Sequence, residues 1–400
     1  MIPKESAVRS PRPLRPRYDA VVVGARCAGA ATALLLARRG LRVLAVERDR
    51  PGADTLSTHA LMRGGVLQLH RWGLLDAVRA AGTPPVRTTS FHYGDEEVAV
   101  PIKARDGVDA LYAPRRTVLD AILVEGARKA GAEVVHGVRL VDLFHSRAGR
   151  VAGVVVQGPD GEPVRIEAGV VIGADGVRST VARLAGAETR REGRHATGVV
   201  YGYWPLAVEG YHWHYRPGVS VGVIPTNGGL TCVFAAAPER RFREEIRFDL
   251  AAGHRRILAK GAPELAAAVA GRSPAGPLRG FAGRKGYLRR SGGPGWALVG
   301  DAGYFKDPIT AHGITDALRD AELLARAVEE GSDRAFADYE AARDALAGEL
   351  FEVSDRIASF DWDIAAAKEL HLALSEEMKR EVAALRALDG EPAPPERRTA

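Results

Sequence analysis

The fold is decided by residues 18–29, which read YDAVVVGARCAG. A short β-branched run that stops at a glycine is typical of a buried parallel strand. An alanine- and leucine-rich helix follows to about Arg39, and Gly40 stands where a helix stop is expected. Residues 41–47 then read as a second apolar strand that ends in Glu47. This order of strand, glycine turn, helix, strand and acidic residue predicts a βαβ unit that binds a nucleotide.

Each part of this unit has a physical task. Gly24 permits the tight turn out of the first strand, and Gly29 lets the helix pack closely on the sheet. The helix N-terminus between them offers free N–H groups and a positive dipole end to a pyrophosphate. Glu47 can accept hydrogen bonds from the ribose hydroxyls of adenosine. The nucleotide-binding residues expected in this unit are Gly24, Arg26, Cys27, Ala28, Gly29, Glu47 and Arg48.

Arg26 stands where such units usually carry their second glycine. The arginine is either a tolerated substitution or a cation whose guanidinium binds the phosphates, and we favour the second interpretation. Cys27 lies at the helix start, where a thiolate is favoured. Small residues are common at this position, so we expect no catalytic role for Cys27.

Two further segments repeat the pattern of an apolar strand that ends at glycine. Residues 170–179 read VVIGADGVRS, and residues 296–303 read WALVGDAG. The second segment passes Asp307-Pro308 and enters a helix at about Gly313, whose apolar residues recur at helical spacing. One such segment alone is weak evidence for a particular protein family, but three in this order on one chain are strong evidence.

Together the three segments resemble the signatures of the FAD-dependent monooxygenases of the para-hydroxybenzoate hydroxylase type, over roughly residues 18–330. The resemblance implies an α/β fold: a Rossmann-like FAD-binding domain with an inserted antiparallel β-sheet substrate domain and C-terminal helices. FAD is the implied cofactor, and NAD(P)H is the implied reductant. No second glycine motif for stably bound NAD(P)H is evident, which fits a transient visit of the reductant or a partner flavin reductase.

The resemblance also implies roles for individual residues. Asp301, after Gly300, would bind the ribityl chain, and Pro308 would lie beside the isoalloxazine. Backbone N–H groups from His312 to Ile314, which include Gly313, would face the flavin N1 and O2 edge and stabilise the reduced anion. Asp175 and Gly176 would contact both the FAD and the pyridine-nucleotide regions. Arg116 would lie near the ribityl and phosphate portion, although a solvated cation at a helix start is the alternative.

The sequence departs from the family where the reaction would take place. Gly303 and Tyr304 replace the usual Ala-His, and residues 306–313 read KDPITAHG. This variant is similar to a branch that borders geranylgeranyl-reductase-like and halogenase-like members. The Trp-x-Trp-x-Ile-Pro segment of halogenases is missing, which disfavours halogenation. No catalytic residue is evident; the candidates are His312, Pro308 and Tyr304, with Lys306 and His59 as further candidate bases.

The implied reaction uses NAD(P)H and O2 to hydroxylate or epoxidise an organic substrate, aromatic or polyene, through a flavin C4a-hydroperoxide. The substrate would come from secondary metabolism. The nearest alternative is an FAD-dependent C=C reductase or dehydrogenase of the geranylgeranyl-reductase-like type. A non-catalytic flavin-binding sensor is the alternative from another class. The substrate, the choice between NADH and NADPH, and a one- or two-component system stay open.

Residues 191–290 differ in character and read as strands at 197–204, 211–215, 219–225 and 230–234. Period 2 places Tyr211, Trp213 and Tyr215 on one face, where they either stack a substrate or pack the sheet. His212 and His214 share the other face. They either serve as a base or substrate anchor or are simply solvated, and we predict no metal site.

Helices are expected at 336–353 and 364–388. The division is a basic arm (1–17), FAD-binding parts (18–190 and 291–330), substrate sheet (191–290), C-terminal helices (331–388) and a disordered tail (389–400).

Composition bounds the remaining possibilities. The chain has 400 residues, 46% of them hydrophobic and 26% charged, and a net charge of +6. The basic residues are scattered, which disfavours nucleic-acid binding. Two cysteines exclude a disulfide scaffold. The sequence shows no secretory signal and no long apolar run, so we expect a cytoplasmic protein without stable membrane insertion. We also expect a monomer or homodimer that acts on a small molecule.

Overall fold

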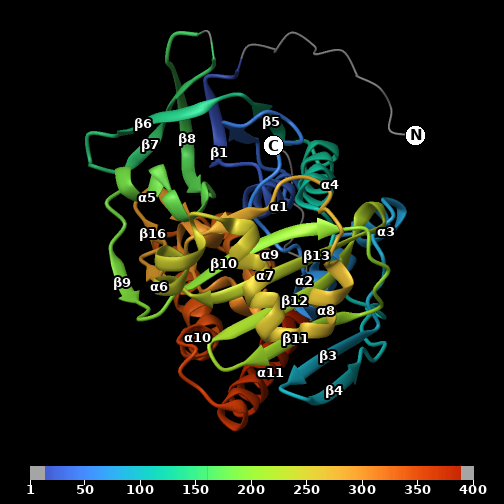
Figure 1. The fold of residues 1–400 in the computed structure, drawn as a ribbon. Helices are drawn as coiled ribbons and strands as arrows, with labels where there is room; N and C mark the ends of the chain where they lie inside the picture. The colour runs from blue at the N-terminus through green and yellow to red at the C-terminus, as the bar shows by residue number, and fades with distance from the viewer. Residues whose placement is uncertain (1–13, 160, 389–400) are drawn as a thin grey trace.

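The computed structural model describes residues 14–159 and 161–388. Its first sheet is built around the strand β1, which contains the first apolar run of the sequence (Figure 1). In spatial order its strands are β16 (Gly292–Gly293), β17 (Trp296–Leu298), β8 (Val164–Gly173), β1 (Arg17–Val23), β2 (Val43–Glu47) and β5 (Glu133–His136). The pairings from β17 to β5 are all parallel. The antiparallel strands β6 (Arg139–His145) and β7 (Val151–Gln157) branch off this order, because β7 pairs with the first residues of β8.

Both faces of β1 are buried, which explains its unbroken apolar sequence. Ala20 and Val22 face a core that includes α1 (Cys27–Arg38), α4 (Arg116–Lys129) and α9 (Gly313–Glu330). Val21 and Val23 face a second core that includes β6, β7 and α5 (Thr180–Leu184). The expected βαβ unit is therefore present, with the helix ending one residue before Arg39.

A second sheet carries the strands expected between residues 197 and 234. Its order is β14 (Arg279–Phe281), β10 (Thr197–Trp204), β13 (Leu230–Pro238), β12 (Val219–Thr226), β11 (Tyr211–Arg216), β3 (Thr88–Tyr93) and β4 (Glu96–Pro101). All pairings are antiparallel except that of β3 with β11. The hairpin β3–β4 comes from residues 88–101, which the sequence division left with the first FAD-binding part.

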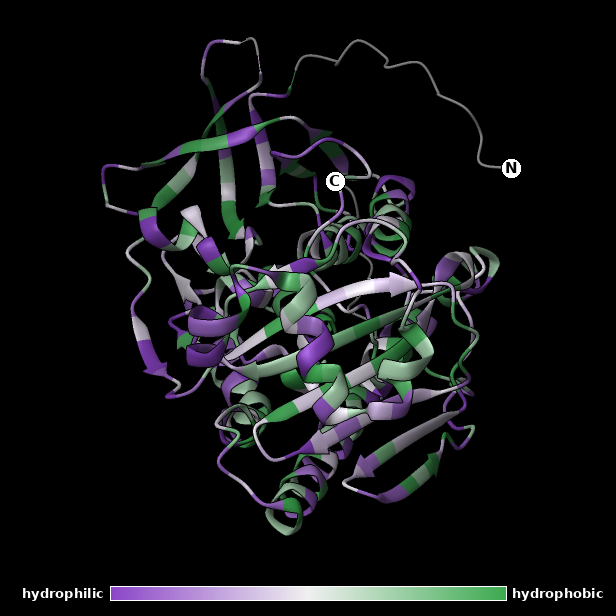
Figure 2. Ribbon diagram, viewed as in Figure 1, coloured by the Kyte–Doolittle hydropathy of each residue, from purple (hydrophilic) through white to green (hydrophobic). Residues whose placement is uncertain are grey.

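The second sheet has two differently covered faces. The outer face packs against α7 (Leu250–Gly261) and α8 (Pro263–Val269). Both helices mix hydrophobic and hydrophilic residues, as helices that cover a sheet do (Figure 2). The inner face carries Tyr211, Trp213 and Tyr215 into the main core, and His212 and His214 lie on the outer face, as period 2 predicts.

The remaining elements close the molecule. A small sheet joins β18 (Tyr304–Phe305), β15 (Tyr287–Arg289) and β9 (Thr189–Glu192). The helices α2 (Arg63–Arg71) and α3 (Leu75–Ala80) precede β3, and α6 (Glu239–Arg241) follows β13. The C-terminal helices α10 (Asp333–Ala358) and α11 (Ile364–Ala387) lie at the end of the molecule opposite β6 and β7 (Figure 1). Among the described residues, no helix combines the length and the apolar character that crossing a bilayer requires.

The predicted fold class is confirmed: a Rossmann-like α/β part, an inserted and largely antiparallel sheet, and C-terminal helices. The helix expected at 336–353 is longer at both ends, because Ser332 caps it and it continues to Ala358. Most of the expected arm, residues 1–13, and the expected tail, residues 389–400, lie outside the described residues.

Candidate functional site

The three glycine-ended strands are neighbours, and their carboxyl ends meet. The Ala174 amide donates to Val23 O (2.8 Å), and the Val299 amide donates to Gly173 O (2.9 Å). Gly24 has φ +102°, and a Cβ there would lie 2.4 Å from Ala174 O. Only glycine fits this close approach between the first two segments. The ends of adjacent parallel strands are where α/β sheets bind ligands.

The third segment touches the first through the helices. A Cβ on Gly300, whose φ is +58°, would lie 2.9 Å from Ala28 Cβ and 3.4 Å from Ala317 Cβ. A Cβ on Gly29 would lie 1.8 Å from Gly24 O. The glycines at 24, 29 and 300 therefore bring α1, α9 and the strand ends into one cluster. The resemblance implied that these segments share one cofactor, and the structure brings them together.

Two helix N-termini open at this cluster without a capping side chain among the described residues. They belong to α1, with Arg26 at the N-cap, and α9, with His312 at the N-cap. In contrast, Asp249, Ser332 and Asp363 cap α7, α10 and α11. The first N–H groups of an uncapped helix need an external acceptor. This pair of termini therefore fits a ligand with a phosphate group and a polar ring edge.

Gly313 is the first residue of α9, and a Cβ there would meet no atom within 4 Å. Nearby, the buried Nδ1 of His312 and Oγ1 of Thr315 have no hydrogen-bond partner among the described residues. Buried polar atoms are normally paired. The open backbone and the two unpaired atoms fit the binding of a polar group at the start of α9. Gly313 and Ile314 are the first two residues of this helix, and their contact with a flavin edge stays a prediction.

Glu47 is buried at the tip of β2 beside the glycine turn. Its Oε2 accepts from the Ala25 amide at 2.9 Å, and its Oε1 accepts from the Asp49 amide at 3.1 Å. A carboxylate has about four acceptor sites, so lone pairs remain for a ribose. Arg48 follows as an exposed residue.

Asp120 on α4 gathers several of the expected residues, and sequence reasoning missed it. Arg116 lies one helical turn earlier and binds it with Nη2 at 3.1 Å. Cys27 Sγ donates to it at 3.1 Å, and Arg26 Nη1 lies 3.4 Å from it. Arg26 also pairs with Asp49 at 2.9 Å. An acidic residue four positions after an arginine on a helix was the available signal.

This cluster determines the state of Cys27. Burial raises the pKa of the Cys27 thiol well above its ordinary value, and Asp120 adds to the rise against the opposing charge of Arg116. The side chain is therefore a neutral thiol at neutral pH. This agrees with the expectation that Cys27 is not a nucleophile.

Asp301 and Asp175 have different environments. Burial, together with the carboxylate of Asp316, raises the pKa of Asp301 to about 6, while Arg116 and Lys306 act in the opposite direction. Asp301 is thus close to Arg116, as the resemblance implies. Asp175 instead accepts from the Ser179 hydroxyl (2.5 Å) and the Thr180 amide (2.6 Å). These bonds stabilise the turn into α5. They occupy both oxygens of the carboxylate that the resemblance expects to contact the nucleotides.

A buried network of charges supports the start of α9, and sequence reasoning missed it. Arg319 binds Asp316 (2.9 Å), Asp320 (2.7 Å) and Glu381 of α11 (2.8 Å). His312 Nε2 lies 2.7 Å from Glu381 Oε2. Although burial acts to raise it, the charges of His312, Arg319 and Lys306 lower the pKa of Glu381 to about 2. The network fixes α11 to the N-terminus of α9.

The candidate catalytic residues differ in their burial and in the partners of their side chains. Lys306 forms a buried ion pair with Asp316. Tyr304 is buried in a cluster with Leu288 and Phe351, which is a packing role. Pro308 is exposed and begins a short 3-10 helix. His312 is held by Glu381. Of the four candidates, Pro308 is therefore exposed, whereas the side chains of the other three already have partners within the protein.

His59 is the remaining candidate, and it lies between the two sheets. It is buried with φ +72°, a strained conformation for a non-glycine residue. Its Nε2 lies 2.5 Å from the hydroxyl of Tyr203 on β10, and Nδ1 has no partner among the described residues. The Arg115 guanidinium lies 3.7 Å from the Tyr203 ring centre.

The same environment determines the protonation of this pair. Burial lowers the pKa of His59 well below its ordinary value, and the charges of Arg115, Arg116 and Arg279 add to the effect. Burial also raises the pKa of Tyr203. His59 is therefore a neutral imidazole that bonds a neutral phenol. Arg115, which lies over the Tyr203 ring, directly precedes Arg116 of the Asp120 cluster, so the pair and that cluster are linked through the start of α4.

The aromatic wall of the second sheet has two parts. Tyr215 packs on His371 of α11, with ring centres 4.1 Å apart, and the Tyr93 hydroxyl lies 3.0 Å from His371 Nδ1. At this end the aromatic face therefore packs against the C-terminal helix α11. At the other end the Tyr201 hydroxyl accepts from the Ser57 amide at 3.1 Å, close to His59.

A sequence model of the FAD binding domain matches residues 17–354 of the chain. The chain belongs to the FAD binding domain family. The expected FAD-dependent oxidoreductase family and its cofactor are thereby confirmed. The match covers all three glycine-ended segments and the second sheet between them.

Curated relatives of this FAD-binding protein include FixC proteins and digeranylgeranylglycerophospholipid reductases. FixC of Salmonella typhi is 33% identical over 230 residues, which is 55% of this chain and 49% of that protein. The chain thus spans about half the length of the FixC proteins it matches. Digeranylgeranylglycerophospholipid reductase of Methanothrix thermoacetophila is 28% identical over 343 residues, 79% of each chain. The predicted border with geranylgeranyl-reductase-like members is confirmed.

Solved structures share the fold of this FAD-binding protein at low identity. PqsL, described as a probable FAD-dependent monooxygenase from Pseudomonas aeruginosa, is 22% identical with a TM-score of 0.68. That similarity covers 93% of this chain and 100% of PqsL. Flavin-dependent halogenases are also among the similar structures. At these identities the similarity establishes the fold alone.

Proposed function

We propose that this protein is an FAD-dependent monooxygenase that uses NAD(P)H and O2 to hydroxylate or epoxidise an organic substrate, aromatic or polyene in character. One observation carries the proposal: buried His59 bonds Tyr203 on the inner face of the second sheet, and Arg115, which directly precedes Arg116 of the Asp120 cluster, lies over the same Tyr203 ring. The His59 Nδ1 atom is unpaired among the described residues, so it is available to a substrate polar group.

FAD supplies the redox and oxygen-activating chemistry when bound. Gly24, Gly29 and the N-terminus of α1 would hold its pyrophosphate, and Asp301 would bind a ribityl hydroxyl. The N-terminus of α9 at Gly313 would stabilise negative charge on the ring edge. These contacts use backbone N–H groups that the fold leaves free of side-chain caps.

The chain's own contribution to the reaction is to orient the substrate, exclude water and move a proton. Neutral His59 can accept a proton from a substrate hydroxyl at Nδ1 when its own proton is on Nε2 and is donated to the Tyr203 hydroxyl oxygen. Nearby Arg115 would stabilise the resulting substrate anion. Tyr201 and Tyr203, whose rings meet edge to face, would form the aromatic part of the substrate wall.

A C=C reductase is the second candidate, and the archaeal reductase similarity over 79% of both chains favours it. A reductase would use the same FAD segments but would not consume O2. His59 would then serve as a proton donor to the reduced carbon, which needs a protonated ring. Burial and three nearby guanidinium groups disfavour the charged ring in either reaction, so the protonation of His59 does not separate the two functions. We prefer the monooxygenase because the three FAD segments resemble those of the para-hydroxybenzoate hydroxylase type.

Steady-state O2 uptake by the FAD-loaded protein with NADH or NADPH and a panel of aromatic and polyene compounds tests the proposal. We expect a substrate that raises O2 uptake, and we expect His59→Gln to lower kcat with little effect on FAD content. Turnover under strict anaerobic conditions would support the reductase instead. Oxidation of NAD(P)H only after addition of a flavin reductase would identify a two-component system.

A further inference from the structure

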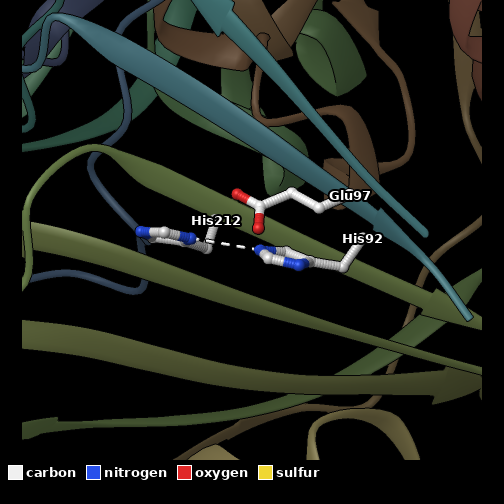
Figure 3. Close-up of side chains that lie close together, drawn as sticks. All are labelled: His92, Glu97 and His212. Carbon is white, nitrogen blue, oxygen red and sulfur yellow. Dashed lines mark hydrogen bonds between the residues drawn. The ribbon is translucent and has the colours of Figure 1, made fainter. Parts of the chain in front are cut away.

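A cluster of imidazole and carboxylate groups lies on the outer face of the second sheet, away from the flavin segments. Three neighbouring strands contribute: His92 from β3, Glu97 from β4 and His212 from β11 (Figure 3). The pairing of β3 with β11 sets His92 opposite His214, and the β3–β4 hairpin sets Glu97 opposite His92. The sequence predicted no metal site because His212 and His214 stood without further ligands.

The two rings that face each other are already held at a chelating distance. His92 Nε2 lies 3.1 Å from His212 Nδ1. Two nitrogen ligands of a tetrahedral zinc ion, each about 2.0–2.1 Å from the metal, are about 3.3 Å apart. A Glu97 carboxylate oxygen lies within 4.8 Å of both nitrogens. Figure 3 shows this carboxylate lying over the hydrogen-bonded pair of rings.

The surroundings orient both rings. His212 Nε2 lies 2.9 Å from the carbonyl oxygen of Glu209, which makes it the donor and leaves Nδ1 as an unprotonated acceptor. Metal-binding histidines usually donate their second ring N–H to such a group. His92 stacks on His214 with ring centres 4.1 Å apart and an interplanar angle of 7°. Glu264 at the start of α8 adds a negative charge that acts on His92.

A second group of metal-type ligands in the described part of the chain, His312, Asp316 and Glu381, serves as a contrast. There, Lys306 and Arg319 already neutralise the carboxylates. A divalent cation would have to displace two buried positive charges. Within the described part of β4, Glu96 pairs with Lys368, whereas Glu97 forms no salt bridge.

We propose that His92, Glu97 and His212 form a binding site for one divalent transition-metal ion of the zinc class, with a fourth position open to water. Two imidazoles and one carboxylate suit Zn²⁺, Ni²⁺ or Cu²⁺ rather than Mg²⁺ or Ca²⁺, which prefer oxygen ligands. On binding, the proton between the two rings leaves, or moves to His92 Nδ1. The ion would join β4, an edge strand exposed along its whole length, to β3 and β11.

The test uses untagged, FAD-loaded protein and isothermal titration with ZnCl2 and, separately, MgCl2. We expect one Zn²⁺ per chain and no Mg²⁺ binding. Changing a residue beyond the direct ligands typically costs about 10–100-fold in metal affinity. His92→Gln, His212→Gln and Glu97→Gln should each cost at least as much. His145→Gln is the matched control, because His145 is an exposed histidine on another sheet, and its affinity should equal that of the wild type.

Melting temperatures distinguish the loss of a metal ligand from a folding defect. Glu97 is exposed, so Glu97→Gln should retain FAD and fold normally. Zn²⁺ should raise the melting temperature of the wild type and of His145→Gln but not of Glu97→Gln. Electron paramagnetic resonance with Cu²⁺ should show coupling to two imidazole nitrogens. Zn²⁺ affinity that is the same in all four variants and the wild type, or no binding by the wild type, would overturn the proposal.

Discussion

Replacing Gly313 by alanine separates cofactor contact from fold stability. Gly313 begins α9, and an added Cβ meets no atom of the chain within 4 Å. The substitution should therefore leave the free energy of unfolding unchanged or raise it by about 0.4–1 kcal/mol through the unfolded chain. If the flavin edge lies against the helix N-terminus, the new methyl group enters that contact. Overpacking of this kind costs about 1–3 kcal/mol, or roughly 5- to 150-fold in the Kd for FAD.

Gly348 provides the matched control, since it lies within α10 and its added Cβ also meets no atom within 4 Å. Gly348→Ala should raise stability by about 1 kcal/mol and leave the Kd for FAD unchanged. The assay is fluorescence titration of FAD into apo-protein, alongside urea unfolding of the same samples. Equal FAD affinity in wild type, Gly313→Ala and Gly348→Ala would refute the placement of the flavin edge at α9.

Three further changes probe the cofactor segments. Asp301→Ala should weaken FAD binding by about 1.5–3 kcal/mol, a loss of a charge-assisted bond, and an unchanged Kd would show that Asp301 does not contact FAD. Arg26→Gly should weaken FAD binding by about 1–3 kcal/mol at low salt and by less at high salt, if the guanidinium leaves Asp49 and Asp120 for the pyrophosphate. Equal affinities at low salt would rule out that recruitment. Because the fold raises the pKa of Asp301 to about 6, the stability from its protonated form is complete below about pH 4 and is lost as pH rises to 6. Asp301→Asn should remove this loss, at most about 3 kcal/mol, in urea unfolding of apo-protein between pH 4 and 6; parallel pH profiles would contradict it.

Local sequence patterns predicted the parts of the fold that depend on neighbouring residues. The strand bounds at 197–204 and the helix start at Gly313 agree with the structure. The alternation of Tyr211 to Tyr215 also agrees, because one face of β11 is buried. The segments that end at Gly24, Gly173 and Gly300 were recognisable because these positions have no room for a side chain: an added Cβ would lie 2.4, 2.8 and 2.9 Å from a neighbouring atom.

Contacts between distant segments could not be predicted in this way. The parallel pairing of β3 with β11 joins residues more than a hundred positions apart, and it alone brings His92 beside His212. The pairing of His312 with Glu381 depends on how α11 returns to α9. His59 stood in a stretch without helical or strand periodicity, and only the fold reveals its bond to Tyr203.

The product formed under ¹⁸O2 tests the central claim most directly. FAD-loaded protein, NAD(P)H and a substrate that raises O2 uptake would be incubated under ¹⁸O2, and the product mass would be measured. The account predicts a product that has gained one oxygen atom, and that atom is ¹⁸O. A product that differs from the substrate only by two hydrogen atoms, formed equally well without O2, would contradict the account.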